Sequence, residues 1–309
     1  VDEIAKKVLG RLDNVLAFYL LYAELLKSDI HKMLISDFNS TSDSILDRWI
    51  LARLNQLIGR VTTAMENYEL DKAARPIADF VDDLSTWYLR RSRERIKGGG
   101  EEGRAALATL RFVLLELAKV MAPFTPFFAE YLYNQVGGEK ESVHLESWPA
   151  ENNQQLTTND RQLLEEMNEV RRIVSLVLEA RAKENIKVRQ PLASLHVKLG
   201  INSHMTDLIK DEVNVKEIIF DKNLKDEVEL DTNITPALKK EGDYREILRR
   251  VQELRKERGL RPGQLATLST SAQIAATGIP QEFETDLKRV ASLEKINHGV
   301  LATGDFELR

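Results

Sequence analysis

Apolar residues in the first half of the chain recur at spacings of three and four, the period of one buried face of an α-helix. The pattern predicts helices over residues 3–27, 44–69, 71–97 and 101–121, and a short apolar helix beginning near Pro126. We expect the four aromatic residues around this short helix to be core residues: Phe124, Phe127, Phe128 and Tyr131. Long helices joined by short links are typical of an antiparallel bundle.

Local signals mark several helix ends. Ser44 and Asp47 have the spacing of a capping box at the start of the second helix. Pro76 predicts either a kink inside the third helix or a helix that begins at Pro76 itself. The three glycines at 98–100 separate the third helix from the fourth.

The second half of the chain has a different texture. A polar stretch over 136–160 is interpreted as a linker or a long surface excursion, and a fifth helix is predicted over 160–184. Further along, strands are predicted over 195–199, 215–220, 226–230, 264–270 and 300–308, and helices over 243–258 and 280–293. The predicted fold is mostly α, with a helical bundle (1–150), a helical connection (151–195) and a small α/β domain (196–309). No internal repeat of about 20–50 residues is evident.

Composition narrows the class of protein. The 309 residues fit two domains, and 43% hydrophobic residues are enough for a sizeable core. A net charge of −5 argues against a nucleic-acid binder that is basic over its whole surface, although one basic patch remains compatible with it. The absence of cysteine excludes disulfides, thiol nucleophiles and cysteine zinc sites, and agrees with a cytoplasmic setting. No apolar run is long enough to span a membrane. The chain begins without Met, so we expect it to be a piece of a longer protein.

The end of the third predicted helix carries the strongest candidate site. One aromatic residue and five basic residues gather there: Trp87, Arg90, Arg91, Arg93, Arg95 and Lys97. Guanidinium groups bind phosphates and base edges, and an indole can stack on an unpaired base, so this set suits an RNA loop. Bases near a helix C-terminus also complement the helix dipole without any ligand, and Trp87 is equally compatible with a place in the core.

Other candidate chemistry is weaker. The chain lacks the GxxxxGK[ST], GxGxxG, GxSxG and HExxH motifs, its five histidines are scattered, and no metal site is predicted. The acidic cluster Asp79, Asp82 and Asp83 is interpreted as a solvated half-helix. The mixed charges of 243–258 predict a salt-bridged surface. Arg181, Lys183, Lys187 and Arg189 give only a faint signal for a second RNA contact.

Several phrases resemble, in order, the anticodon-binding helical domain of class I isoleucyl-tRNA synthetases. They are DRWILARLNQLI (47–58), YELDKAARPIADFVDDLSTWYLRRSR (68–93), MAPFTPFFAEYLY (121–133) and SVHLESWP (142–149). The stretches 179–195 and 228–260 resemble the C-terminal extension of the archaeal and eukaryotic-like branch of that family. The phrases WYLRRSR and VRQPL favour the isoleucine enzyme over the valyl type.

The resemblance implies a tRNA-binding part of an ATP-dependent isoleucine–tRNA ligase used in protein biosynthesis. The HIGH and KMSKS signatures of the catalytic domain are missing from the sequence, so it implies that this chain alone catalyses nothing. It implies no cofactor in this chain, ATP and Mg in the parent enzyme, isoleucine tRNA as partner, no DNA or membrane partner, and a monomer. The tRNA-binding residues would be Trp87, Arg90, Arg91, Arg93, Arg95 and Lys97. The alternatives are the same part of a valyl-type synthetase and a non-catalytic helical module that docks proteins.

Overall fold

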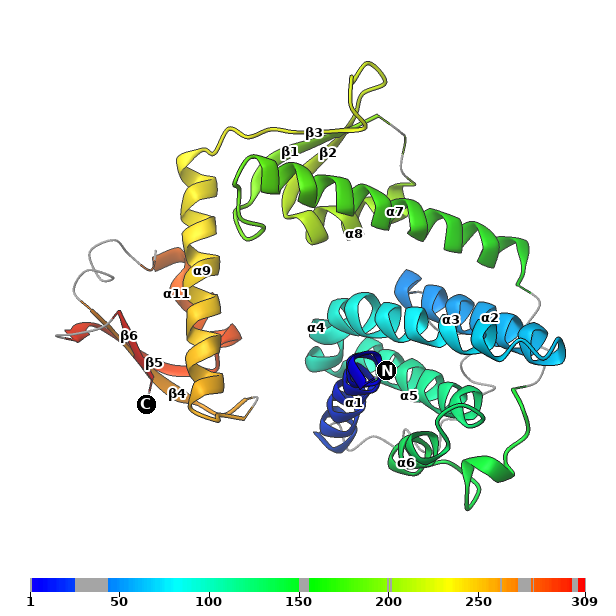
Figure 1. The fold of residues 1–309 in the computed structure, drawn as a ribbon. Coiled ribbons are helices and arrows are strands. Elements are labelled where there is room, and N and C mark those ends of the chain that lie inside the picture. The colour runs from blue at the N-terminus through cyan, green and yellow to red at the C-terminus, as the bar shows by residue number, and fades with distance from the viewer. Residues whose placement is uncertain are drawn as a thin grey trace. The chain divides into compact units, whose positions relative to one another are not determined.

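The computed structural model describes residues 2–25, 44–149, 156–198, 200, 202–261, 263–271, 279, 281–301 and 305–308. The chain divides into two compact units, Val1–Met167 and Asn168–Arg309 (Figure 1). Within the described ranges, no helix is long and apolar enough to cross a membrane.

The first unit is a bundle of helices. Its elements are α1 (Asp2–Leu25), α2 (Ile45–Glu66), α3 (Leu70–Asp82), the π-helical segment η3 (Asp83–Leu89), α4 (Arg90–Gly98), α5 (Gly100–Met121), α6 (Pro126–Val136) and the short 3₁₀ turn η4 (Val143–Leu145). The predicted apolar faces form its core: Leu12, Leu54, Val61, Phe80, Leu107 and Leu114 are essentially inaccessible to solvent. The mostly α fold class is therefore confirmed.

The third predicted helix is interrupted by the π-helical segment η3. Trp87, Tyr88 and Leu89 are buried one after another there, which one face of a regular α-helix does not allow. A π segment carries more residues per turn than the flanking α-helix, so it changes which residues of α4 face outward. Pro76 lies inside α3, and the Ala73 amide donates to the Glu69 carbonyl, so the helix begins before the proline.

Two sequence predictions for the first unit are wrong. The Ser44 side chain makes no capping hydrogen bond at the start of α2, and the Asp47 carboxylate is buried and bonded to other residues. Phe127 is 92% exposed and Tyr131 45% exposed, so these two aromatic residues are not core residues. Helix α6 instead buries the face that carries Ala129, Leu132, Tyr133 and Val136.

Part of the predicted linker packs back on the bundle. The Glu130 carboxylate accepts hydrogen bonds from the Val143 amide and the Ser142 hydroxyl, both at 2.9 Å. The Trp148 indole donates to the Thr62 hydroxyl at 2.9 Å. Residues 137–149 thus belong to the first unit, whereas the predicted stretch at 150–155 lies outside the described residues.

The second unit contains two small sheets of the same design. Its elements are α7 (Thr158–Lys183, which begins in the first unit), β1 (Leu192–Val197), α8 (Ser203–Val213), β2 (Val215–Phe220), β3 (Val228–Leu230), α9 (Pro236–Glu257), β4 (Ala266–Ser271), α11 (Gln281–Val290), β5 (Leu293–Leu301) and β6 (Phe306–Leu308). The strand orders are β2-β1-β3 and β5-β4-β6. In each sheet the central strand pairs parallel to one neighbour and antiparallel to the other (Figure 1).

Sequence patterning placed most of these elements but erred at three. The predicted strand 300–308 is the end of β5 followed by the separate strand β6. Helix α8 was not predicted, because its short polar sequence has only a few apolar residues, among them the buried Met205, Ile209 and Val213. Helix α9 also begins earlier than predicted, at Pro236, where the Thr235 hydroxyl caps it by accepting from the Leu238 amide.

Candidate nucleic-acid interface

Three of the predicted site residues are exposed on α4. Arg90, Arg93 and Lys97 follow each other at spacings of three and four, so they lie on one side of the helix. Each of these side chains also contacts a neighbouring residue. The Arg90 Nε donates to the Thr86 carbonyl at 2.6 Å, the Arg93 guanidinium lies 5.7 Å from the centre of the Phe18 ring, and Lys97 pairs with Glu94 at 2.7 Å. Their charges face water, where a phosphate can reach them.

Trp87 and Arg91 are positioned differently. Trp87 belongs to the π-helical segment and is only 9% exposed, so little of its ring surface is open for stacking on a base. Arg91 is half-buried. The structure therefore places Trp87 where the alternative interpretation had it, in the core of the bundle.

Arg95 is the anchor of the basic helix. Its two terminal nitrogens donate to the two oxygens of Asp47, at 2.6 and 2.9 Å, in a bidentate ion pair. The Tyr88 hydroxyl lies 2.8 Å from the same carboxylate and 3.0 Å from the Ala106 carbonyl. Asp47 is completely buried. This cluster of Asp47, Tyr88 and Arg95 joins α2, η3, α4 and α5 at a single point.

The electrostatics of the cluster follow from its burial. Burial raises the pKa of Tyr88 well above its ordinary value, and the neighbouring Asp47 charge raises it further. Burial alone would lower the pKa of Arg95, but the hydrogen bonds and charge of Asp47 outweigh that effect and raise it. Arg95 therefore stays cationic and Tyr88 neutral near neutral pH.

The acidic half of the same helix is not simply solvated, as the sequence had predicted. Asp83 is buried and accepts from the Arg53 guanidinium at 2.8 Å, and Asp82 pairs with Arg11. These pairs neutralise acids that lie about two to four turns before Arg90, Arg93 and Lys97. Sequence reasoning missed Arg53 and Asp47 as functional partners. The available signal was that both residues lie on α2, whose apolar residues predicted a buried face.

Several basic residues of the second unit have structural partners. The mixed charges of α9 form the predicted surface network, with Arg249 paired to Glu246 at 2.9 Å and Arg250 to Glu257 at 3.2 Å. Arg181 is completely buried and cannot touch RNA, and Arg255 is nearly so. Within the described residues, no group of three or more His, Asp or Glu is placed to hold a metal ion.

Comparison with known proteins relates the chain to tRNA ligases. Residues 47–199 match the family described as the anticodon-binding domain of tRNA ligase, a region that runs from α2 to β1. The isoleucine–tRNA ligase of Clostridium tetani is 38% identical over 265 residues, covering 83% of this chain and 24% of that protein. That of Deinococcus radiodurans is 39% identical over 227 residues, covering 71% of this chain and 20% of that protein. That of Chlamydia trachomatis serovar L2 is 37% identical over 229 residues, with 71% and 21% covered.

The chain thus spans about a quarter or less of the length of these relatives. All three are bacterial, and the predicted likeness to the archaeal and eukaryotic-like branch stays a prediction. The names of the relatives favour the isoleucine enzyme over the valyl alternative.

Proposed function

The chain belongs to the isoleucine–tRNA ligase family and carries its anticodon-binding domain, and from this premise we propose that it binds the anticodon region of isoleucine tRNA. The observation that carries the proposal is the anchored basic helix. The ion pair between the buried Asp47 and the partly buried Arg95 fixes α4, while Arg90, Arg93 and Lys97 remain exposed on it. A rigid helix with cations on one side suits the phosphates of an RNA loop.

Within this proposal the six predicted residues have different roles. Arg90, Arg93 and Lys97 contact the RNA directly. Trp87 and Arg95 act from inside the bundle, by supporting the π-helical segment and by holding α4 in place. Arg91, half-buried beside them, belongs to the supporting set.

The parent protein would be a cytoplasmic, monomeric enzyme that joins isoleucine to its tRNA with ATP and Mg. The contribution of this chain would be to bind the tRNA so that a catalytic domain acts on the distant acceptor end. By itself the chain would bind tRNA without DNA or a membrane as partner, and would form no aminoacyl-tRNA.

The test is binding of the purified chain to transcribed isoleucine tRNA at two salt concentrations, beside valine tRNA and an isoleucine tRNA with a changed anticodon. Salt-sensitive binding that weakens when only the anticodon changes would support the proposal. Equal binding to all three RNAs would contradict anticodon recognition. No binding to any of the three RNAs at low salt would favour the competing function, a module that docks proteins.

Single variants locate the contact. Arg90→Gln, Arg93→Gln and Lys97→Gln should each weaken binding and reduce the salt slope by about one, because each removes one phosphate contact. The matched control is Arg75→Gln, which removes an 80% exposed arginine paired with Asp71 near the start of α3. If all three variants bind like the control, α4 is not the RNA contact.

A further inference from the structure

The second unit contains two copies of one structural module. Module 1 is α7-β1-α8-β2-β3 and module 2 is α9-β4-α11-β5-β6. Their sheets have the same strand order, and their parallel pairs begin in the same register, Leu192 opposite Val215 and Ala266 opposite Leu293. A two-helix, three-strand motif thus occurs twice in succession.

A buried arginine closes the same loop in both modules and gives a residue-by-residue correspondence. Arg181 donates to the carbonyls of Lys187, Gln190 and Asn214, at 3.1, 3.0 and 2.9 Å. Arg255 donates to the carbonyls of Arg261, Gln264 and Ser292, at 3.1, 2.7 and 3.4 Å. Asn214 and Ser292 both have a positive φ, 55° and 49°, directly before the second strand. Gln190 therefore corresponds to Gln264, Pro191 to Leu265, and Lys216 to Glu294.

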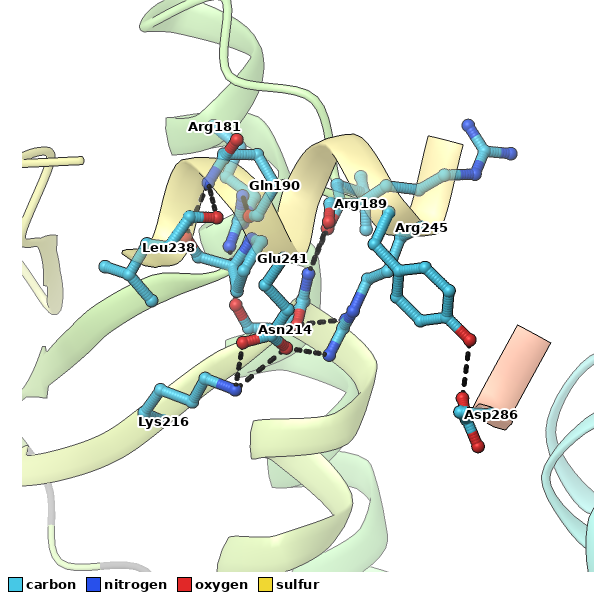
Figure 2. Close-up of polar contacts among 12 residues, drawn as sticks. Arg181, Arg189, Gln190, Asn214, Lys216, Leu238, Glu241, Arg245 and Asp286 are labelled. Atoms are coloured by element: carbon cyan, nitrogen blue, oxygen red, sulfur yellow. Dashed lines mark hydrogen bonds and ion pairs between the residues drawn. The ribbon is translucent and has the colours of Figure 1, made fainter. Parts of the chain in front are cut away.

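In module 1 these positions are covered by the N-terminal half of α9 (Figure 2). The Gln190 amide donates to the Leu238 carbonyl at 2.8 Å, and Lys216 pairs with Glu241 at 2.6 Å. Arg245 donates to the Asn214 side chain. Gly242 is buried against Gln190, where an added Cβ would lie 2.4 Å from the Gln190 Oε1. Module 1 thus binds a helix that presents a glycine and an acid.

In module 2 the corresponding positions are open to solvent. Leu265 is 64% exposed, whereas Pro191 is buried. Glu294 and Gln264 are exposed, and the Gln264 side chain turns back to accept from the amide of Arg261 at 3.1 Å. The same glutamine that bonds a helix in module 1 bonds its own loop in module 2. We call Gln264, Leu265, Ser292 and Glu294 the open surface.

We propose that the open surface is a docking site for a basic amphipathic α-helix. The contact between module 1 and α9 defines the geometry of such a complex. A small residue of the helix, Gly242, lies against Gln190, and the charged residue one position earlier, Glu241, pairs with Lys216 of β2. The charge is reversed in module 2, because an acid, Glu294, stands where module 1 has Lys216. The helix that fits therefore carries Lys or Arg where α9 carries Glu241.

The probe is a helix-stapled peptide of residues 235–249 with Glu241→Lys, titrated into the full chain and followed by amide NMR. Its matched control keeps Glu241. We expect the Lys peptide to shift the amide signals of the open surface and to bind about fivefold more tightly than the control. Leu265→Asp in the chain should weaken the Lys peptide about tenfold, and Glu294→Lys should reverse the preference between the two peptides. Gly242→Leu in the peptide should abolish binding.

Several outcomes would overturn the proposal. They are no binding of the Lys peptide, equal binding of both peptides, or binding that Leu265→Asp leaves unchanged. Leu265 is exposed, so Leu265→Asp should unfold at the same denaturant concentration as the parent chain, and this comparison separates lost docking from lost folding. If tRNA shifts the open surface and the Lys peptide does not, the surface is an RNA contact and the proposal fails.

Discussion

The two units bury arginine in opposite ways. In the first unit the guanidinium of Arg95 meets the carboxylate of Asp47, a full charge from another helix. In the second unit the hydrogen bonds that Arg181 and Arg255 donate to described residues go to backbone carbonyls. The first arrangement joins helices that are far apart in sequence, whereas the second fixes the loop that follows the helix carrying the arginine.

The electrostatic consequences differ accordingly. Asp47 raises the pKa of Arg95 against the effect of burial. Burial, with some repulsion from Arg245, lowers the pKa of Arg181 to about 10, and burial lowers that of Arg255 as well. Neutral carbonyl dipoles replace the lost hydration of the guanidinium only in part. The structural contribution of these two arginines is therefore the loop conformation that their hydrogen bonds fix.

The largest effect is expected from breaking the charged pair. Asp47→Ala leaves the Arg95 cation without its buried partner and should lower the free energy of unfolding of the first unit by about 4 kcal/mol. Urea unfolding followed by circular dichroism measures this. The double variant Asp47→Leu, Arg95→Met removes both charges and should recover most of the loss. A cost below about 1 kcal/mol for Asp47→Ala would show that water reaches Arg95 and that the pair is not an anchor.

A smaller effect is expected at the lone arginines. Arg181→Met keeps an apolar stem but leaves three carbonyls without their donor, and should lower the free energy of unfolding by about 3 kcal/mol. Arg255→Met should cost about 2 kcal/mol, because Arg255 is slightly more exposed and one of its three bonds is long, 3.4 Å. Amide hydrogen exchange at the two loops, 187–190 and 261–264, reports each module separately. Equal protection in the variants and the parent chain would refute the shared role of the two arginines.

This contrast also marks the limit of prediction from the sequence. Periodicity was sufficient for the bundle faces, such as Leu54 and Val61 on α2, and for the strand 215–220, because burial of apolar residues dominates there. Helical spacing also separates Arg90, Arg93 and Lys97 from Trp87, Arg91 and Arg95, but it does not show that only the first set is exposed, so all six were predicted to bind tRNA. Asp47 was interpreted as a cap because an acid near a helix start has that local use, and its partner lies on another helix.

The duplication escaped sequence analysis for a related reason. The two modules share an arginine and a glutamine at equal spacing, Arg181 with Gln190 and Arg255 with Gln264, and little else that is conspicuous. What they repeat is backbone conformation, such as the positive φ of Asn185 and Gly259 in the two loops. Each module is also longer than the repeats of about 20–50 residues that were sought.

The smallest effect is a pH dependence specific to module 2. The Tyr244 hydroxyl donates to Asp286 at 2.5 Å, and this bond, with the Arg289 charge, holds the pKa of that carboxyl below its ordinary value. The carboxylate therefore stabilises the folded state above the unfolded pKa of about 3.9, and the contribution is lost as pH falls through the lower, folded value. Asp286→Asn should lower the free energy of unfolding by about 1 kcal/mol at pH 6 and leave it unchanged near pH 2, as measured by urea unfolding at both pH values.

Tyr244→Phe is the matched control, because it removes the same bond from the other side and should lose its effect over the same pH range. Arg181 in module 1 bonds to neutral carbonyls, so a cost of Arg181→Met that also vanished in acid would erase the distinction between the two kinds of contact.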